Sequence, residues 1–254
     1  MSRVVVVSGG GTGIGRAVAE RFAQDADEVV VIGRRADVLD RAAAEITDAG
    51  APAKVVAVTA DLSDPAEADR VRTVLGERYG RVDVLVHSAG GNAALGAPAS
   101  QGSPAAQAAA HWTENFRSNV LTTVLLTEAL RDLFTAPGGR IVLLSSIAAY
   151  RGSGSGSYAG AKAALHPYAY DLAAALGGQG VTVNVVAPGY IADTEFFRGA
   201  LSAEREQLLI AQTSTGRAGI PQDVAETVHW LASPSAGQIT GQIIQVNGGA
   251  ERGR

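Results

Sequence analysis

Short apolar runs alternate with segments of helical periodicity along this chain. The first run, residues 4–7, consists of four valines with no polar break, which is typical of a strand that is buried on both faces. The alternation of such runs with helices predicts an α/β fold, in which a parallel sheet is covered by helices on both sides. We expect further strands at Glu28–Gly33 and at residues 54–59, 82–87, 140–145, 181–187 and 242–246.

Two helix starts are marked by capping residues. Asp64, Pro65 and Glu67 have the order of an N-cap, a proline at the first helical position and an acidic residue at the third. Pro221 predicts a second helix start just ahead of Asp223.

Two longer segments are rich in small apolar residues. Residues 115–134 and 157–176 predict long helices, and Pro167 predicts a kink in the second because its nitrogen cannot donate a hydrogen bond. Residues 90–110 are rich in Ala, Gly, Ser and Pro, so they predict a surface loop with a short helix near residues 104–110.

The composition favours one domain spanning residues 1–254. With 46% hydrophobic and 18% charged residues, the chain is long enough to bury one large core, and it contains no internal repeat or linker. The N-terminal apolar run is too short for a signal peptide, and no segment approaches 18 apolar residues in a row. We therefore expect a soluble, cytoplasmic protein.

Charge and metal-binding residue types exclude several function classes. The net charge of −4 argues against nucleic acid as a partner and against an anionic membrane surface. The absence of cysteine excludes disulfides and thiolate metal sites, and the four histidines are not spaced as ligands. No metal is expected.

A glycine-rich turn follows the first strand. Gly9, Gly11, Gly13 and Gly15 lead directly into an amphipathic helix, and a helix start with small neighbours and unpaired N–H groups is a natural phosphate site. An isolated motif of this kind also fits a plain turn between a strand and a helix. Here a second strand follows about 20 residues on, which favours the phosphate site.

The carboxyl ends of parallel strands meet at one edge of a sheet, where ligands bind. This edge is therefore where we look for chemistry. The residues expected to gather there are 9–15, 33–35, Asp61, 87–90, Ser145, Ser146 and 188–194.

Tyr158 and Lys162 lie four residues apart among helix formers, so both side chains leave one face of the predicted helix. The pair can be an ordinary exposed one. If Tyr158 is a general acid/base, its pKa must fall from about 10 toward 7, which takes roughly 4 kcal/mol of phenolate stabilisation. A lysine about 4 Å away supplies that amount only in a partly dehydrated site. Catalysis by Tyr158 therefore requires a cleft with a bound cofactor.

Together these motifs resemble the short-chain dehydrogenase/reductase family over essentially the whole chain. The shared elements are Gly9-x-x-x-Gly13-Ile14-Gly15, Ser88-Ala89-Gly90, Asn119, Ser145-Ser146, Tyr158-x-x-x-Lys162, Pro188-Gly189, and Gly216-Arg217 through Asn247-Gly248-Gly249. The resemblance implies a doubly wound, single-domain Rossmann fold with about seven parallel strands in the order 3-2-1-4-5-6-7.

The resemblance also implies a catalytic tetrad of Asn119, Ser146, Tyr158 and Lys162. Tyr158 would exchange a proton with the carbonyl or alcohol oxygen, and Ser146 would hydrogen-bond that oxygen. Lys162 would bind the nicotinamide ribose and lower the Tyr158 pKa, while Asn119 would hold a water that links Lys162 to solvent. The expected cofactor-binding residues are Gly9, Gly11, Thr12, Gly13, Ile14, Gly15, Gly33, Arg34, Arg35, Asp61, Leu62, Ser88, Ala89, Gly90, Tyr158, Lys162, Pro188, Gly189, Ile191 and Thr194.

Two serines compete for the catalytic position. The spacing to Tyr158 favours Ser145, whereas the alignment of the strand with the flanking residues favours Ser146. Successive strand residues point to opposite faces, so only one of the two can face the substrate. We choose Ser146.

Four features depart from the family pattern, and one of them is Pro167, inside the predicted helix that carries Tyr158. His87 replaces an asparagine that usually ends this strand, and we interpret it as structural. Residues 91–112 form a longer segment than usual, bordering the substrate. Thr194 comes one residue later than the threonine of the usual Pro-Gly-x-x-x-Thr motif.

The end of the second strand predicts the choice of cofactor. NAD-specific folds place an acidic residue there for the adenosine ribose, but this chain has Gly33. Arg34 and Arg35 follow, and a guanidinium can clamp a 2′-phosphate in a bidentate, charge-assisted way. We expect NADP(H) to be preferred over NAD(H), with Arg16 adding to the positive field and Asp61 contacting adenine. The alternative is that the two arginines only form a solvated loop.

The sequence thus predicts an NADP(H)-dependent oxidoreductase that acts on a small-molecule carbonyl or secondary alcohol, most similar to 3-oxoacyl-carrier-protein reductases. A sugar or small-alcohol dehydrogenase is the alternative within the family. A nucleotide-bound redox sensor without turnover is the alternative from another class, although it would have no use for Tyr158. In similar proteins, two long helices like those predicted here pair across a two-fold axis, so the resemblance implies a homodimer or homotetramer. The alternative is that their faces only cover the sheet.

Overall fold

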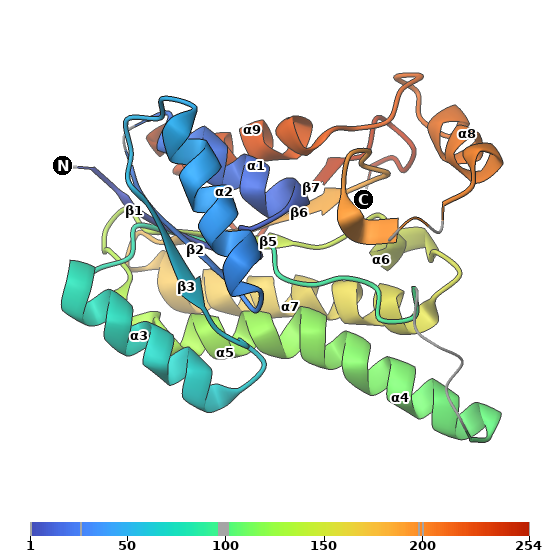
Figure 1. Ribbon diagram of the computed structural model, residues 1–254, viewed down its shortest axis with the longest axis horizontal. Helices are drawn as coiled ribbons and strands as arrows, with labels where there is room; N and C mark the ends of the chain where they lie inside the picture. The colour runs from blue at the N-terminus through green and yellow to red at the C-terminus, as the bar shows by residue number, and fades with distance from the viewer. Residues whose placement is uncertain (1, 26, 96–101, 198, 200, 254) are drawn as a thin grey trace.

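The computed structural model describes residues 2–25, 27–95, 102–197, 199 and 201–253. At its centre is one sheet of seven parallel strands in the order β3-β2-β1-β4-β5-β6-β7 (Figure 1), which is the order that the resemblance implies. The strands lie within one or two residues of their predicted bounds. They are β1 (Val4–Ser8), β2 (Glu28–Gly33), β3 (Val55–Thr59), β4 (Val84–His87), β5 (Arg140–Leu144), β6 (Thr182–Pro188) and β7 (Ile243–Val246).

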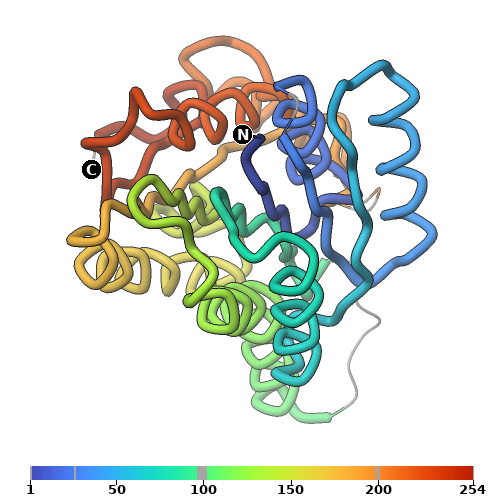
Figure 2. Tube along the Cα trace, turned by 90° about the vertical axis from the view of Figure 1, so that its left-hand side faces the viewer, coloured from blue at the N-terminus to red at the C-terminus, as the bar shows by residue number. Residues whose placement is uncertain are grey.

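Helices cover both faces of the sheet, which confirms the predicted doubly wound architecture (Figures 1 and 2). One face is covered by α1 (Gly13–Ala23), α2 (Ala36–Asp48) and α9 (Pro221–Leu231), and the other by α3 (Pro65–Tyr79), α5 (Thr122–Ala129) and α7 (Gly156–Gly177). The remaining α-helices of the described residues are α4 (Pro104–Phe116), α6 (Ala148–Arg151) and α8 (Ala203–Ala211). Within the described part of the chain, no helix is both long and apolar enough to cross a membrane.

The pleat of each strand divides its side chains between two cores. In β1, Val5 and Val7 pack on the side of α1, α2 and α9, whereas Val6 packs on the side of α3, α5 and α7. These three valines are fully buried, as predicted for this strand. Burial of each side chain stabilises the fold by roughly 1.5–3 kcal/mol. The strand is therefore a firm anchor for the glycine-rich turn that follows it.

Both predicted helix starts are confirmed. α3 begins at Pro65, and the Asp64 carboxylate accepts a hydrogen bond from the Ala66 N–H at 2.9 Å. α9 begins at Pro221, with Asp223 in its first turn. α7 continues as one helix through Pro167, so the kink expected there does not end it.

The structure between residues 90 and 134 differs from its prediction. α4 starts at Pro104 as expected but extends to Phe116, and residues 96–101 of the predicted loop lie outside the described residues. The single helix predicted for residues 115–134 is wrong. A π-helical segment, η1 (Arg117–Leu121), joins α4 to α5, and a 3-10 turn, η2 (Arg131–Leu133), follows.

Several hydroxyl side chains lie along this irregular segment. The hydroxyls of Ser118, Thr122, Thr123 and Thr127 each donate to the carbonyl four residues earlier. Such bonds offer the backbone carbonyls an alternative to the regular helical ladder. Single π-helical turns are frequent at functional sites, and this one carries Asn119.

Candidate active site

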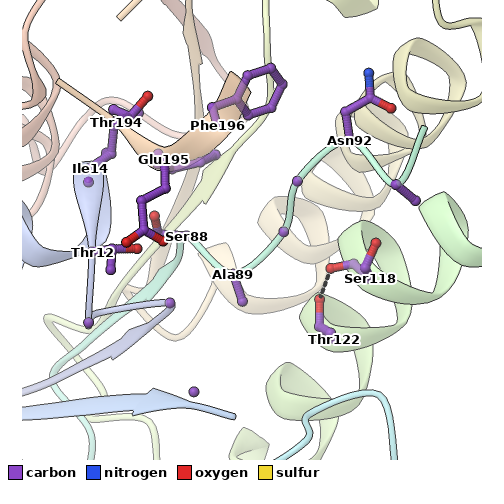
Figure 3. Close-up of a pocket in the computed structure, with 18 of the residues that line it drawn as sticks. Thr12, Ile14, Ser88, Ala89, Asn92, Ser118, Thr122, Thr194, Glu195 and Phe196 are labelled. Atoms are coloured by element: carbon purple, nitrogen blue, oxygen red, sulfur yellow. Dashed lines mark hydrogen bonds between the residues drawn. The ribbon is translucent and has the colours of Figure 1, made fainter. Parts of the chain in front are cut away.

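A pocket of about 1010 Å³ lies at the carboxyl ends of the parallel strands (Figure 3). It brings together nearly all the predicted site residues; Gly15 and Asn119 alone lie behind its wall rather than on it. The predicted residues that line it are Gly9, Gly11, Thr12, Gly13, Ile14, Gly33, Arg34, Arg35, Asp61, Leu62, Ser88, Ala89, Gly90, Ser146, Tyr158, Lys162, Pro188, Gly189, Ile191 and Thr194.

The glycine-rich turn forms a cradle with no room for side chains. Gly9 and Gly13 have positive φ angles of 68° and 51°. A Cβ on Gly15 would lie 2.3 Å from the Gly9 carbonyl oxygen, and one on Gly9 would lie 2.8 Å from the backbone of Ala89. Thr12, the N-cap of α1, makes no side-chain capping bond to the described backbone, so the first N–H groups of α1 remain available to an anion.

Tyr158 stands in the first turns of α7, and its hydroxyl hydrogen-bonds to Ser146. Tyr158 is only 6% exposed, and burial raises its pKa to about 12 although the bond to Ser146 acts in the opposite direction. The lowered pKa that the sequence argument requires for a base is therefore not present in this structure. The neutral phenol is the form that dominates at pH 7.

Lys162 lies one turn further along α7 and is also buried. Its Nζ donates to the Leu144 carbonyl at 2.9 Å, at the end of β5. Burial lowers the Lys162 pKa to about 8, so the side chain is still mainly an ammonium at neutral pH. The Leu144 carbonyl thus holds the Lys162 ammonium in the pocket wall, one helical turn from Tyr158.

The two serines after β5 face different neighbours. Ser146 bonds to Tyr158 and accepts the Ala148 N–H at 3.1 Å. Ser145 instead donates to the Lys162 carbonyl at 3.0 Å and lies 2.8 Å from Nε2 of His166. Ser145 therefore connects β5 to α7, and Ser146 is the serine beside the phenol. That Ser146 acts in catalysis stays a prediction.

Asn119 secures the chain that leaves β4. Its amide nitrogen donates to the carbonyls of Gly91 and Asn115 at 2.8 and 2.9 Å, and its Oδ1 accepts the Gly91 N–H at 3.1 Å. A Cβ on Gly90 would lie 2.4 Å from Asn119 Oδ1 and 3.3 Å from Lys162 Nζ. The missing side chain at Gly90 is what allows Asn119 and Lys162 to approach each other.

His87 ends β4 and is buried, with Nε2 at 2.8 Å from the Thr127 hydroxyl. Its Nδ1 has no hydrogen-bond partner among the described residues. Burial lowers the His87 pKa to about 3, so the ring is neutral at physiological pH. These contacts join β4 to α5 and support the structural interpretation.

The adenosine end of the pocket contains a charged cluster that the sequence argument only partly identified. Asp61 accepts from the Ser63 hydroxyl at 2.6 Å and from Arg117 at 2.9 Å. The Ser63 hydrogen bond is the main cause that lowers the Asp61 pKa from its ordinary value, and the charges of Arg117 and Arg34 lower it further. Arg117, on η1, was not predicted to lie here. Arg34 forms no hydrogen bond or ion pair with the described residues, whereas Arg35 pairs with Glu195 at 2.9 Å.

The expectation that Arg16 adds to the positive field at the pocket needs correction. Its guanidinium pairs with Glu20 at 2.8 Å and with Glu45 at 2.7 Å. Two carboxylates therefore neutralise it, and the second comes from α2, which the local sequence around Arg16 could not reveal.

A short segment after β6, residues 194–197, covers the pocket and is named the cover segment here. Thr194 lies at the glycine-rich turn, since a Cβ on Gly13 would come within 3.4 Å of its methyl group. The Phe196 ring lies 5.4 Å from the Tyr158 ring, and the Phe197 ring 5.0 Å from that of Phe196. Glu195, Phe196 and Phe197 were not among the predicted site residues; two adjacent aromatic residues just past a strand end were the available signal.

Known proteins resemble this chain over nearly its full length. A family model described as "Enoyl-(Acyl carrier protein) reductase" matches residues 9–251. The 3-oxoacyl-[acyl-carrier-protein] reductase FabG of Escherichia coli (strain K12) is 34% identical, with 97% of this chain and 96% of that protein covered. The short-chain reductase protein NovJ of Streptomyces niveus is 33% identical, with 97% and 93% covered. The structure of a short chain dehydrogenase from Burkholderia cenocepacia in complex with NADP has a TM-score of 0.84 at 29% identity, with 98% and 97% covered.

Proposed function

This chain belongs to the short-chain dehydrogenase/reductase family of oxidoreductases, and we propose that it uses NADP(H) to interconvert a carbonyl and a secondary alcohol. The observation that carries the proposal is the hydrogen-bonded pair of Tyr158 and Ser146 in the same pocket as the glycine-rich cradle. The cradle fits a dinucleotide, because its missing side chains and the open N-terminus of α1 leave room and donors for a diphosphate.

When bound, the nicotinamide would supply or take up a hydride. Tyr158 donates the proton in the reductive direction. Since burial raises its pKa to about 12, the phenol stays protonated at neutral pH and is ready to protonate a carbonyl oxygen. Ser146, fixed by the Ala148 N–H, keeps its hydroxyl beside the same phenol and hydrogen-bonds the substrate oxygen.

Lys162 and Asn119 would assist proton transfer by Tyr158 without contacting the substrate oxygen. The Lys162 ammonium, held by the Leu144 carbonyl, binds the ribose hydroxyls of the nicotinamide half and stabilises negative charge on Tyr158 in the oxidative direction. Asn119 holds the chain around Gly91 next to Lys162. It would retain the water that links Lys162 to solvent.

The preference for NADP(H) rests on the end of β2. Gly33 offers no carboxylate to the adenosine ribose, and Arg34 lines the pocket without an ion-pair partner among the described residues. A charge-assisted bond to a 2′-phosphate contributes about 1.5–3 kcal/mol, or roughly a tenfold to hundredfold preference. The NADP complex of the Burkholderia relative supports this choice.

The substrate would be an acyl-type ketone similar to that of 3-oxoacyl reductases, as the name of the Escherichia coli relative suggests. Phe196, Phe197 and Tyr190 give the outer part of the pocket apolar walls that suit an acyl chain better than a sugar. This lining favours the 3-oxoacyl-like reading over a sugar dehydrogenase.

Self-association would involve the outer helices. Trp112 and Phe116 of α4, Leu121 of η1 and Tyr170 of α7 are all at least 36% exposed, and α4 contacts both η1 and α7. A second copy would cover them in a homodimer or homotetramer.

The test follows the oxidation of NADPH and NADH by absorbance against β-ketoacyl thioesters, diketones, quinones and sugars. Tyr158→Phe keeps the ring that packs on Phe196 but removes the proton, so kcat should fall at least about 100-fold while the Kd of NADPH stays within about twofold. Tyr168→Phe removes a phenol hydroxyl from the same helix and is the matched control, with kcat unchanged. Retention of more than about a tenth of kcat by Tyr158→Phe would refute the role of Tyr158. Turnover of none of the substrates would favour a redox sensor.

A further inference from the structure

Two neighbouring side chains of the cover segment, Glu195 and Phe196, point in opposite directions and contact opposite ends of the pocket. Figure 3 shows the Glu195 side chain extending toward Thr12, while the Phe196 ring points away from the Glu195 side chain. The Glu195 carboxylate bonds to Arg35 at 2.9 Å, and the Phe196 ring lies against Tyr158. These adjacent residues therefore connect the adenosine end of the pocket to the proton donor.

Arg35 occupies the position where an added phosphate would be read. It follows Gly33 and Arg34 at the end of β2 and is the N-cap of α2. Two features attract an anion to the N-terminus of α2: the Arg35 guanidinium and the positive end of the α2 dipole. In this structure the anion is the carboxylate of Glu195.

A carboxylate and a phosphate that need the same guanidinium exclude each other in part. A guanidinium has five N–H donors, and Glu195 engages those of Arg35 at Nη2. A phosphate that shares the site brings two anions together, so one of them must move or both must accept weaker bonds.

We propose that Glu195 is a specificity-determining residue that competes with the 2′-phosphate of the cofactor for Arg35. The inference rests on the proposed NADP(H) preference and deepens it: Arg34 supplies attraction to the phosphate, and Glu195 limits how much Arg35 can add. When the phosphate takes Arg35, the cover segment loses its anchor at the adenosine end. Binding of the 2′-phosphate thereby loosens the segment that holds Phe196 over Tyr158.

The size of the effect follows from the exposure of the pair. Arg35 and Glu195 side chains are 57% and 63% exposed, so solvent screens their attraction. Exposed pairs of this kind change affinities by about 1.5-fold to fivefold. The competition therefore tunes the preference for NADP(H) and does not reverse it.

The experiment measures Kd by calorimetry on the full chain with adenosine 2′,5′-bisphosphate and with 5′-AMP, which lacks the 2′-phosphate. Glu195→Gln should tighten the bisphosphate by about twofold to fivefold and leave 5′-AMP within about 1.5-fold. Glu204→Gln removes the same charge from α8, away from the pocket lining, and should change neither Kd.

The double variant decides the mechanism. In an Arg35→Ala background, Glu195→Gln should give no further gain, because the group for which they compete is gone. An equal gain on 5′-AMP, a gain that persists without Arg35, or no gain at all would overturn the inference. If Arg34→Ala and Arg35→Ala both leave the bisphosphate Kd unchanged, the proposed NADP(H) preference itself fails. If Arg34→Ala weakens bisphosphate binding but Glu195→Gln does not tighten it, only the competition at Arg35 fails.

Discussion

The two serines after β5 allow a sharp separation of catalytic and structural roles. Ser145→Ala and Ser146→Ala each remove one hydroxyl just after the end of β5. The hydrogen bonds that the two substitutions remove are different. Ser146→Ala removes the partner of the Tyr158 hydroxyl and the proposed donor to the substrate oxygen. Loss of one such donor typically costs about 2.7–4 kcal/mol in the transition state, so kcat should fall about 100-fold to 1000-fold.

Ser145→Ala should act on stability instead. It leaves the Lys162 carbonyl and the His166 ring without their 2.8–3.0 Å contacts inside the protein. The loss of hydrogen bonds to a buried carbonyl and a half-buried ring costs about 0.5–1.5 kcal/mol each. We expect the free energy of unfolding to drop by that order while kcat falls no more than about tenfold, since Lys162 shifts only indirectly.

The assay pairs steady-state kcat with urea unfolding of the same preparations. The expected result is a crossed pattern, in which Ser146→Ala is folded but inactive and Ser145→Ala is active but less stable. A severe loss of kcat at Ser145, with Ser146→Ala nearly unchanged, would show that the roles are reversed.

The remaining predictions test the cofactor, the buried histidine and the assembly. NADPH should exceed NADH by at least about tenfold in kcat/KM, with Arg34→Ala removing most of that preference and Gly33→Asp reversing it; equal use of both cofactors by the unmodified protein would refute the argument. Because the folded-state pKa of His87 is about 3, below its unfolded value of about 6.5, its contribution to stability is lost as pH falls through this window. His87→Asn should make the pH dependence of unfolding in urea shallower there by about 1.4 kcal/mol per pH unit, and an unchanged slope would contradict neutral burial. Light scattering at micromolar concentration should give the mass of a dimer or tetramer, and a monomeric mass would mean that α4 and α7 only cover the sheet.

The fold was predictable because its signals are local. Val4–Ser8 and the other buried strands are short β-branched runs, and a parallel sheet needs no further information than their alternation with helices. The winding between Pro104 and Leu133 was not predictable in the same way. Its apolar spacing fits an ordinary helix, and that spacing does not distinguish an α-helical from a π-helical turn.

In the candidate site, too, features set by local sequence were predictable and contacts between distant residues were not. Gly9, Tyr158 and Lys162 could be found because the motif spacing and the strand ends fix where they lie. Charges could be counted from the sequence but not paired. Arg16 looked available to a phosphate until Glu45 of α2 was seen beside it.

Pairing across the pocket changes what a basic residue can do. Arg34 and Arg35 are adjacent in sequence and equivalent to any argument from composition, yet only Arg35 meets Glu195, which lies far along the chain in the cover segment. A guanidinium with a carboxylate partner must release that partner or bind both anions more weakly when a phosphate arrives, whereas Arg34 has no such bond to break within the described residues. The two arginines should therefore contribute unequally to cofactor choice, and Arg34 should carry the larger part.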